Sequence, residues 1–490
     1  AMFHPTKEVF KKRCREGNLI PVTAEIMADL ETPVSAFLKL GGGPYSFLLE
    51  SVEGGGGSGR YSFLGTGPRT VFRARGRRAE FLRDGEWEGH DTGDPLALLQ
   101  DELARYRVVP GEGLPPFAGG AVGYLAYDAV RWFERLPATL KDDLDLPDAC
   151  FMLTDTLLAF DRHTNKITIM ALAHVTGKPD AAYAKAVLAI QSVIEALKRP
   201  LPQDAVSYLG GSESRGFKSR ISQPRFQKMV EAAKEHIRAG DILQAVLSLR
   251  FEAPLYADPF ALYRSLRVLN PSPYMFYLNF GEFALVGASP ELMAKKVGME
   301  ATVRPIAGTR PRGASPEEDR HLERELRADE KEKAEHVMLV DLGRNDLGRV
   351  CLPGSVKVAE YMNVDRYSHV MHLVSTVTGQ LKPGTSAFDL VRATFPAGTV
   401  SGAPKIRAMQ IIEELEPHRR GPYAGMVGYF DYSGNFDSAI TIRTILAKEG
   451  RAYIQTGAGI VADSLAEREY QECKHKARAL VRAVEMAQGA

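Results

Sequence analysis

The chain has 490 residues, of which 44% are hydrophobic and 25% charged, so it is long enough for two or three globular domains. Lys and Arg number 62 against 61 Asp and Glu, a balance that gives no long-range field for nucleic acid or an anionic membrane, and we expect neither as a partner. No apolar run reaches the roughly 18 residues of a membrane span, and the cysteines lack zinc-site or disulfide spacing, which favours a cytoplasmic protein.

Antiparallel strands are predicted for the first half of the chain. Apolar and polar residues alternate in YSFLLESV (45–52), RTVFRARG (69–76), AEFLRDGEW (79–87) and ACFMLTDTLLAFDR (149–162). The Pro-, Gly- and Ser-containing stretch 198–216 then predicts a linker. We place a domain boundary there, between residues 1–210 and 211–490.

Helices and strands alternate in the second half. Phe226, Met229, Val230, Ala233 and Ile237 recur at helical spacing, and the strand-like ILQAVLSLRFE (242–252) follows. Long charged helices are predicted over 316–342 and 465–487. The mixture predicts an α+β fold, in which large antiparallel β-sheets form a sandwich with helices packed outside.

Two pairs of carboxylates lie on the predicted long helices. Glu332 and Glu335 would project from one face of the first helix, and Glu469 and Glu472 from one face of the last. Four such groups in one place would repel one another unless a cation neutralised them, and Mg²⁺ prefers oxygen ligands. On spacing alone, a solvated helix face is the simpler explanation of each pair.

Several segments in the second half suit a small anion. TFPAGTVSGAPK (394–405) leads into a helix whose first N–H groups could receive a carboxylate. Arg443, in the predicted strand AITIRTIL (439–446), could clamp a second carboxylate, and Gly457 to Gly459 would let a ligand approach the backbone. For Arg443 an exposed strand position is the simpler explanation, and for His372 a satisfied core histidine is.

Eight strings in the second half resemble the chorismate-utilising enzyme family. They are GASPEL (287–292), PIAGTRPRG (305–313), AEHVMLVDLGRNDLG (334–348), SHVMHLVS (368–375), PAGTVSGAPK (396–405), GPYAGMVGY (421–429), TIRT (441–444) and QTGAGIVADS (455–464). LLESV (48–52), RYSFLG (60–65), GGAVGYLAYD (119–128) and NPSPYMFYL (270–278) extend the resemblance to the large subunits of anthranilate synthases.

The resemblance implies a magnesium site and a chorismate site. Mg²⁺ would be held by Glu335 and Glu472, with Glu332 and Glu469 beside them. Glu291 would protonate the departing C4 hydroxyl of chorismate, and His372 would assist the later elimination. The implied chorismate contacts are Gly308, Thr309, Thr399, Tyr423, Arg443, Gly457, Ala458, Gly459 and Lys476, with Thr309 also counted among the catalytic residues.

Two positions distinguish reactions within the family. Gln244 stands where isochorismate and salicylate synthases carry a lysine that activates water, and an amide cannot act as that base. Ala307 stands where many aminodeoxychorismate synthases carry a nucleophilic lysine. The resemblance therefore implies that ammonia adds to chorismate and that pyruvate then leaves, giving anthranilate. The alternatives are an aminodeoxychorismate synthase component I and a catalytically inactive tryptophan-sensing subunit.

The resemblance also implies an inhibitor and a partner. L-Tryptophan would bind Glu50 and Ser51 together with Pro273, Tyr274 and Met275. No segment with the character of a glutaminase is visible in the sequence, so a glutamine amidotransferase subunit would supply ammonia, typically within a heterotetramer.

Overall fold

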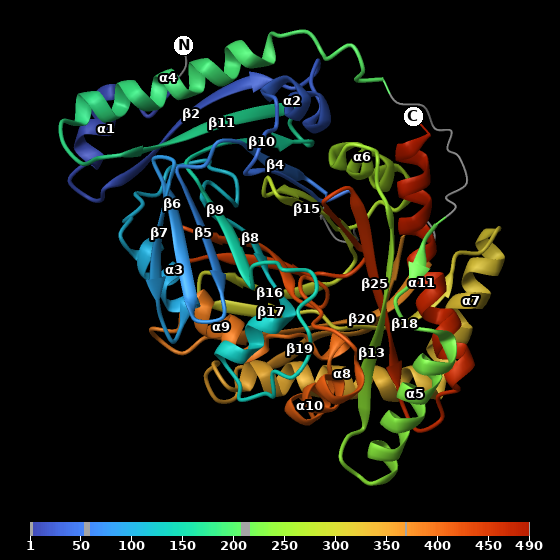
Figure 1. Cartoon of the computed structure of the whole chain (residues 1–490). Helices are drawn as coiled ribbons and strands as arrows, with labels where there is room; N and C mark the ends of the chain where they lie inside the picture. The colour runs from blue at the N-terminus through green and yellow to red at the C-terminus, as the bar shows by residue number, and fades with distance from the viewer. Residues whose placement is uncertain (1–2, 53–58, 207–215, 368–369, 490) are drawn as a thin grey trace.

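Two large antiparallel sheets face each other, and helices cover their outer surfaces (Figure 1). The computed structural model describes residues 3–52, 59–206, 216–367 and 370–489. This arrangement confirms the predicted α+β fold. No helix in these ranges is long and apolar enough to cross a membrane.

The first sheet joins strands from both halves of the chain. Its order is β1 (Phe3–His4), β2 (Leu19–Met27), β11 (Lys166–His174), β10 (Thr156–Asp161), β4 (Tyr61–Gly65), β3 (Ser46–Glu50), β14 (Tyr274–Asn279), β15 (Phe283–Ser289), β24 (Thr444–Lys448), β25 (Arg451–Ile460), β13 (Gln244–Pro254) and β12 (Lys218–Ser219), with β21 (Gly402–Ala403) also paired to β13.

The second sheet also mixes the two halves. Its order is β18 (Ile306–Pro311), β20 (Val370–Gln380), β17 (Glu300–Val303), β16 (Leu292–Val297), β23 (Phe436–Ile440), β22 (Met426–Asp431), β8 (Gly120–Leu125), β9 (Ala149–Thr154), β5 (Thr70–Arg75), β6 (Arg78–Arg83) and β7 (Glu86–Asp91), with β19 (Lys357–Arg366) paired to β20. The predicted boundary at residue 210 lies outside the described residues, and the division into 1–210 and 211–490 stays a prediction.

The helices pack on the outer faces of the sheets. They are α1 (Lys7–Arg13), α2 (Pro33–Leu40), α3 (Pro95–Ala104), α4 (Pro179–Leu197), α5 (Gln223–Arg238), α6 (Pro259–Leu269), α7 (Pro316–Ala328), α8 (Glu330–Gly348), α9 (Ala387–Thr394), α10 (Lys405–Leu415) and α11 (Ala466–Gln488), with short 3-10 turns η1 (Tyr127–Trp132) and η2 (Gly398–Val400). Helices α4, α6 and α11 contact the first sheet, and α3, α8 and α9 contact the second.

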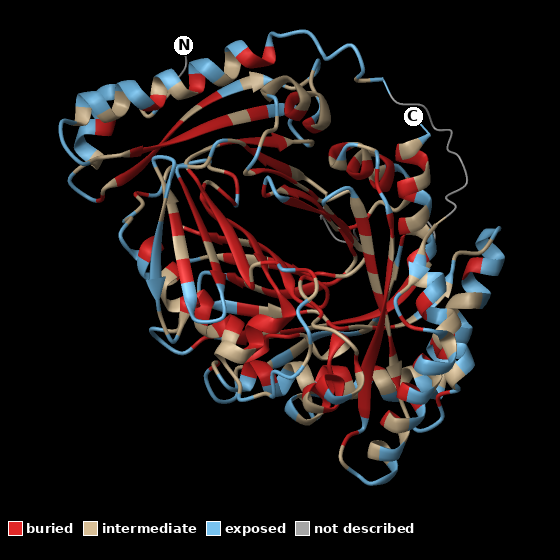
Figure 2. Ribbon diagram, viewed as in Figure 1, coloured by how far each residue is buried: buried red, intermediate tan, exposed pale blue. Residues whose placement is uncertain are grey.

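Successive side chains of one strand point to opposite faces of the sheet, so one strand contributes to two hydrophobic cores. In β14, Met275 and Tyr277 pack under the helices, whereas Phe276 and Leu278 face the space between the sheets. Both faces are therefore buried, and Figure 2 shows buried strands inside and exposed helix surfaces outside. Burial of apolar area on both sides is the main stabilising contribution.

The prediction that Arg443 lies in a strand is wrong. Strand β23 belongs to the second sheet and β24 to the first, so the chain crosses between sheets over residues 441–443. Arg443 adopts a left-handed conformation at this corner, with φ of 49°. The alternating residues of 439–446 therefore belong to two strands in different sheets.

The single helix predicted over 316–342 is also wrong in detail. It is two helices, α7 and α8, which meet at Asp329. The Asp329 carboxylate accepts hydrogen bonds from the backbone N–H groups of Lys331 and Glu332 and so caps α8. The other predicted helices, over 226–237 and 465–487, are confirmed as α5 and α11.

A buried ion pair between Glu416 and Arg420 ties α10 to β13. The two side chains are 2.9 Å apart, and Arg420 also donates to the carbonyls of Val400 and Val246. We expect Arg420→Leu to lower the free energy of unfolding by about 3–5 kcal/mol, because it leaves a buried carboxylate unpaired. Urea unfolding measures this change. Lys198→Ala, in an exposed ion pair with Glu195, is the control and should leave the midpoint nearly unchanged.

Candidate active site

A glycine segment, Gly457–Gly459 of β25, lies where several predicted side chains meet. A Cβ atom at Gly457 would collide with the Tyr423 hydroxyl, and one at Gly459 would collide with the amide nitrogen of Gln244. Ala458 points the other way into the apolar core. Only glycine at the first and third positions therefore lets these polar groups approach the strand.

Two of the predicted metal ligands lie next to this glycine segment. Glu335 on α8 accepts a 3.0 Å hydrogen bond from Gln244 Nε2. Lys476 on α11 donates to the Gly457 carbonyl at 2.9 Å and forms a 2.6 Å ion pair with Glu472. Residues far apart in the sequence, on the two predicted helices, thus come to the same short stretch of β25.

The other two carboxylates carry raised pKa values. Burial, followed by the charge of Glu335, raises the pKa of Glu332, which also pairs with Arg310 at 3.2 Å. Burial, followed by the charge of Glu472, raises the pKa of Glu469. A cation would relieve this repulsion, so the donor set fits Mg²⁺, which often takes one or two carboxylates plus water and substrate oxygens. Among the described residues, no three acidic, His or Cys groups are close enough to hold a metal by themselves.

Glu291 is a buried carboxyl that is protonated at neutral pH. Its side chain lines a cavity of about 40 Å³ together with Thr399. Burial raises the pKa of Glu291 to about 8, against the opposing effects of the Thr399 hydroxyl, the Ile306 N–H and the Lys476 charge. A group in this state can donate a proton at pH 7.

Thr309, His372 and Arg443 form a second group nearby. The Thr309 hydroxyl and His372 Nδ1 are 2.9 Å apart, across the β18–β20 pair. Burial, followed by the charge of Arg443, lowers the pKa of His372 to about 4, so the imidazole is neutral at pH 7. Arg443 shares a cavity of about 30 Å³ with His372, and its guanidinium has no hydrogen-bond or ion-pair partner in the described part of the chain. An unpaired guanidinium of this kind fits a carboxylate ligand.

Glu50 occupies a buried polar network on the other side of the first sheet. Its carboxylate accepts hydrogen bonds from Tyr263, Arg267 at 2.8 Å and Arg162 at 3.1 Å. Met275 lies directly opposite Glu50 in the β3–β14 pair. These two predicted tryptophan contacts therefore share one face of the sheet.

The remaining predicted tryptophan contacts lie in different surroundings. The buried Ser51 hydroxyl has no hydrogen-bond partner among the described residues. The Tyr274 hydroxyl donates to Asp437 of the second sheet at 3.0 Å, so this side chain faces away from Glu50. Pro273 lines the cavity that holds His372 and Arg443. The segment thus touches both the Glu50 face and the predicted chorismate contacts.

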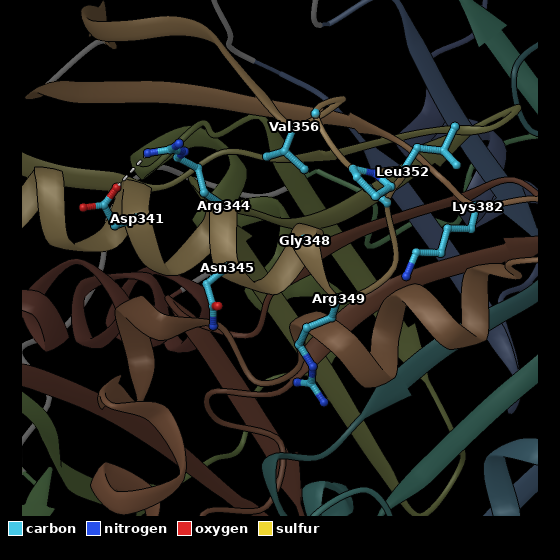
Figure 3. Close-up of a pocket in the computed structure, with 11 residues that line it drawn as sticks. Asp341, Arg344, Asn345, Gly348, Arg349, Leu352, Val356 and Lys382 are labelled. Carbon is cyan, nitrogen blue, oxygen red and sulfur yellow. Dashed lines mark hydrogen bonds and ion pairs between the residues drawn. The ribbon is translucent and has the colours of Figure 1, made fainter.

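A larger pocket of about 680 Å³ lies at the C-terminal end of α8 (Figure 3). It is open and lined by Asp341, Arg344, Asn345, Gly348, Arg349, Cys351, Leu352, Pro353, Gly354, Val356 and Lys382. Its rim includes an exposed ion pair between Asp341 and Arg344. None of the predicted site residues lines this pocket, so we assign the chemistry to the smaller cavities.

His336 was not predicted as a functional residue. It is fully buried on α8, and its two ring nitrogens contact the Ala307 carbonyl of β18 and the Ser375 hydroxyl of β20. Its one sequence signal is its position directly after Glu335. A histidine in that place is also a common core residue, so the sequence does not distinguish the two roles.

The raised pKa of Glu291 predicts a change in stability with pH. Its pKa rises from 4.5 to about 8 on folding, so its contribution to stability is lost as the pH rises between these values. We expect Glu291→Gln to become more stable relative to the unaltered protein between pH 5 and pH 8. Urea midpoints across this range check the shift, with Glu195→Gln at an exposed position as the control. Parallel profiles for the Glu291 variant and the unaltered protein would contradict the assigned pKa.

Comparisons with known proteins identify the family of the chain. A model of the chorismate binding enzyme family matches residues 46–482. Anthranilate synthase component 1 of Synechocystis sp. is 49% identical, with 99% of each chain covered. The protein of that name from Thermus thermophilus is 50% identical, with 96% of this chain and 98% of that one covered.

Solved structures extend the agreement to the fold. Anthranilate synthase component I of Streptococcus pneumoniae superposes with a TM-score of 0.77 at 38% identity, covering 93% of this chain and 99% of that one. The menaquinone-specific isochorismate synthase of Escherichia coli has a TM-score of 0.72 at 19% identity, covering 97% and 99%, and so shares the fold. The chain therefore belongs to the anthranilate synthase component I family of chorismate-binding enzymes.

Proposed function

We propose that this chain converts chorismate and ammonia to anthranilate and pyruvate through aminodeoxyisochorismate, the first committed step of L-tryptophan biosynthesis. The observation that carries the proposal is a set of three groups in adjoining cavities: a protonated Glu291, a neutral His372 and an unpaired Arg443. Pro290 lines one cavity and the next residue, Glu291, lines the other, so both cavities border this segment.

Each of these groups suits one part of the reaction. Glu291 would give its proton to the C4 hydroxyl of chorismate, which leaves as water while ammonia adds at C2. His372, oriented by Thr309, would then take the C2 proton as pyruvate leaves and the ring becomes aromatic. Arg443 and Tyr423 would bind the enolpyruvyl carboxylate.

The four carboxylates support a magnesium requirement. Bound at Glu335 and Glu472, Mg²⁺ would neutralise the ring carboxylate and stabilise negative charge near the reacting carbons. Glu332 and Glu469 would lie beside this position, and their pKa values are raised first by burial and then by the charges of Glu335 and Glu472, a repulsion that a cation would offset.

The choice of nucleophile rests on two side chains. Gln244 is 3% exposed and its amide is held by Glu335, so the position offers no base that could activate water. Ala307 offers no amine to attack the ring. Both observations support addition of ammonia at C2 over the reactions of isochorismate and aminodeoxychorismate synthases.

A second subunit is part of the proposal. The relatives are named component 1, which implies a second component. Ammonia is mostly protonated at neutral pH, so a glutamine amidotransferase subunit that releases it in a sheltered path would serve this site, in a cytoplasmic heterotetramer.

Feedback inhibition by L-tryptophan is proposed at the Glu50 face. Ser51 supplies a buried hydroxyl with no partner in the described chain, and Met275 supplies an apolar wall beside Glu50. Since Pro273 also lines the cavity of His372 and Arg443, an effector that moves this segment would disturb the site.

The function is tested by turnover of chorismate with ammonium and magnesium. We expect fluorescent anthranilate and pyruvate from the unaltered chain, and loss of magnesium-dependent turnover in Glu335→Gln and in Glu472→Gln while both remain folded. Glu330→Gln, on the exposed side of α8, is the matched control. A product that keeps its enolpyruvyl group would indicate an aminodeoxychorismate synthase, and no product at all would indicate an inactive sensing subunit.

The inhibitor site is tested separately. We expect Ser51→Ala and Met275→Thr to raise the tryptophan concentration for half-inhibition by about tenfold, because each removes a contact worth about 1.4 kcal/mol. The turnover assay without tryptophan should change little. Unchanged inhibition in both variants would place the effector elsewhere.

A further inference from the structure

His336 connects α8 to two strands of the second sheet. It follows Glu335 directly and is fully buried. Its Nδ1 lies 3.0 Å from the Ala307 carbonyl oxygen of β18, and its Nε2 lies 2.6 Å from the Ser375 hydroxyl of β20. One imidazole therefore ties the helix of the proposed metal ligands to both strands.

The partners of His336 determine its protonation. A carbonyl oxygen only accepts, so Nδ1 carries the hydrogen, and Nε2 of the neutral ring accepts the Ser375 O–H. The Ser375 oxygen in turn accepts the backbone N–H of Met362 at 2.9 Å. Both ring nitrogens are thereby satisfied, which holds the ring in one orientation.

The Ala307 end of this chain supports an irregular piece of backbone. Between Ile306 and Thr309, three residue steps on β18 face two on β20, which is a β-bulge. Gly308, within the bulge, has a φ of 97°. Bulges redirect side chains. The Nδ1–H of His336 donates to the carbonyl oxygen of Ala307 within this bulge, directly before Gly308 and Thr309, which are expected to contact chorismate.

His336 is also the first buried residue of α8 in chain order. The buried side chains of this helix are His336, Leu339, Val340, Asp346 and Leu347. Glu332 and Glu335 precede all of them. The turn that carries these carboxylates therefore depends on His336 for its orientation relative to the sheet.

We propose that His336 is a positioning residue, which sets the proposed magnesium ligands on α8 against the bulged segment at Ala307–Thr309 by bonding both strands at once. This inference rests on the proposed function. It differs from a general core role because the ring uses two directed hydrogen bonds.

Binding of Mn²⁺ as a substitute for Mg²⁺, followed by electron paramagnetic resonance without substrate, tests the inference. His336→Phe fills the space but removes both hydrogen bonds, and we expect its Mn²⁺ dissociation constant to rise about tenfold. His336→Asn keeps an N–H for Ala307 and should lose less. Leu347→Ala, fully buried on the same helix, should lower stability without changing Mn²⁺ affinity.

Kinetics give a second readout. With folded protein confirmed by circular dichroism, His336→Phe should raise the magnesium concentration for half-maximal turnover and the KM for chorismate more than it lowers kcat. Unchanged Mn²⁺ affinity in His336→Phe, or an equal loss in the Asn and Phe variants, overturns the inference. Failure of the unaltered chain to turn over chorismate would instead contradict the proposed function.

Discussion

The absence of side chains at two positions of one strand is the constraint on which the candidate site depends. Gly457 and Gly459 lie on the same face of β25, and any Cβ there would displace Tyr423 or Gln244. Because Gln244 also holds Glu335, and the Gly457 carbonyl accepts from Lys476, the strand organises groups from β13, α8 and α11 and from the turn that carries Tyr423. A Cβ at Gly459 would therefore displace the Gln244 amide that holds Glu335, whereas a Cβ at Gly457 would displace the Tyr423 phenol.

Burial, as well as ion pairing, determines which side chains of the candidate site carry a charge. Burial keeps Glu291 protonated and His372 neutral at pH 7, so an acid and a base coexist in adjoining cavities. Arg443 lies beside them without an ion-pair partner in the described residues. Such a combination leaves the positive charge free for a carboxylate of the proposed substrate, at a cost in desolvation that the surrounding fold must offset.

Crossings of the chain between the sheets place these groups. Strand β9 belongs to the second sheet and β10 to the first, and β23 and β24 repeat this change of sheet. The second crossing sets Arg443 at a corner between the sheets with a positive φ. The same architecture explains why the region of Glu50 and Met275 borders the site, since β14 connects through Pro273 to the cavity of His372.

The sequence by itself determined the class of fold, the family and the positions of several helices and strands, because alternation, helical spacing and long family strings are local signals. The resemblance predicted roles for Glu291, His372 and Gln244, and periodicity predicted α5, α11 and β13, which the structure confirms. Only the tertiary structure decided that Arg443 lies at a corner, that α7 and α8 are separate, and that His336 bonds two strands. These features depend on contacts between residues that are distant in the chain. The protonation of buried groups depends on burial in the same way. A local sequence pattern records neither the distant contacts nor the burial.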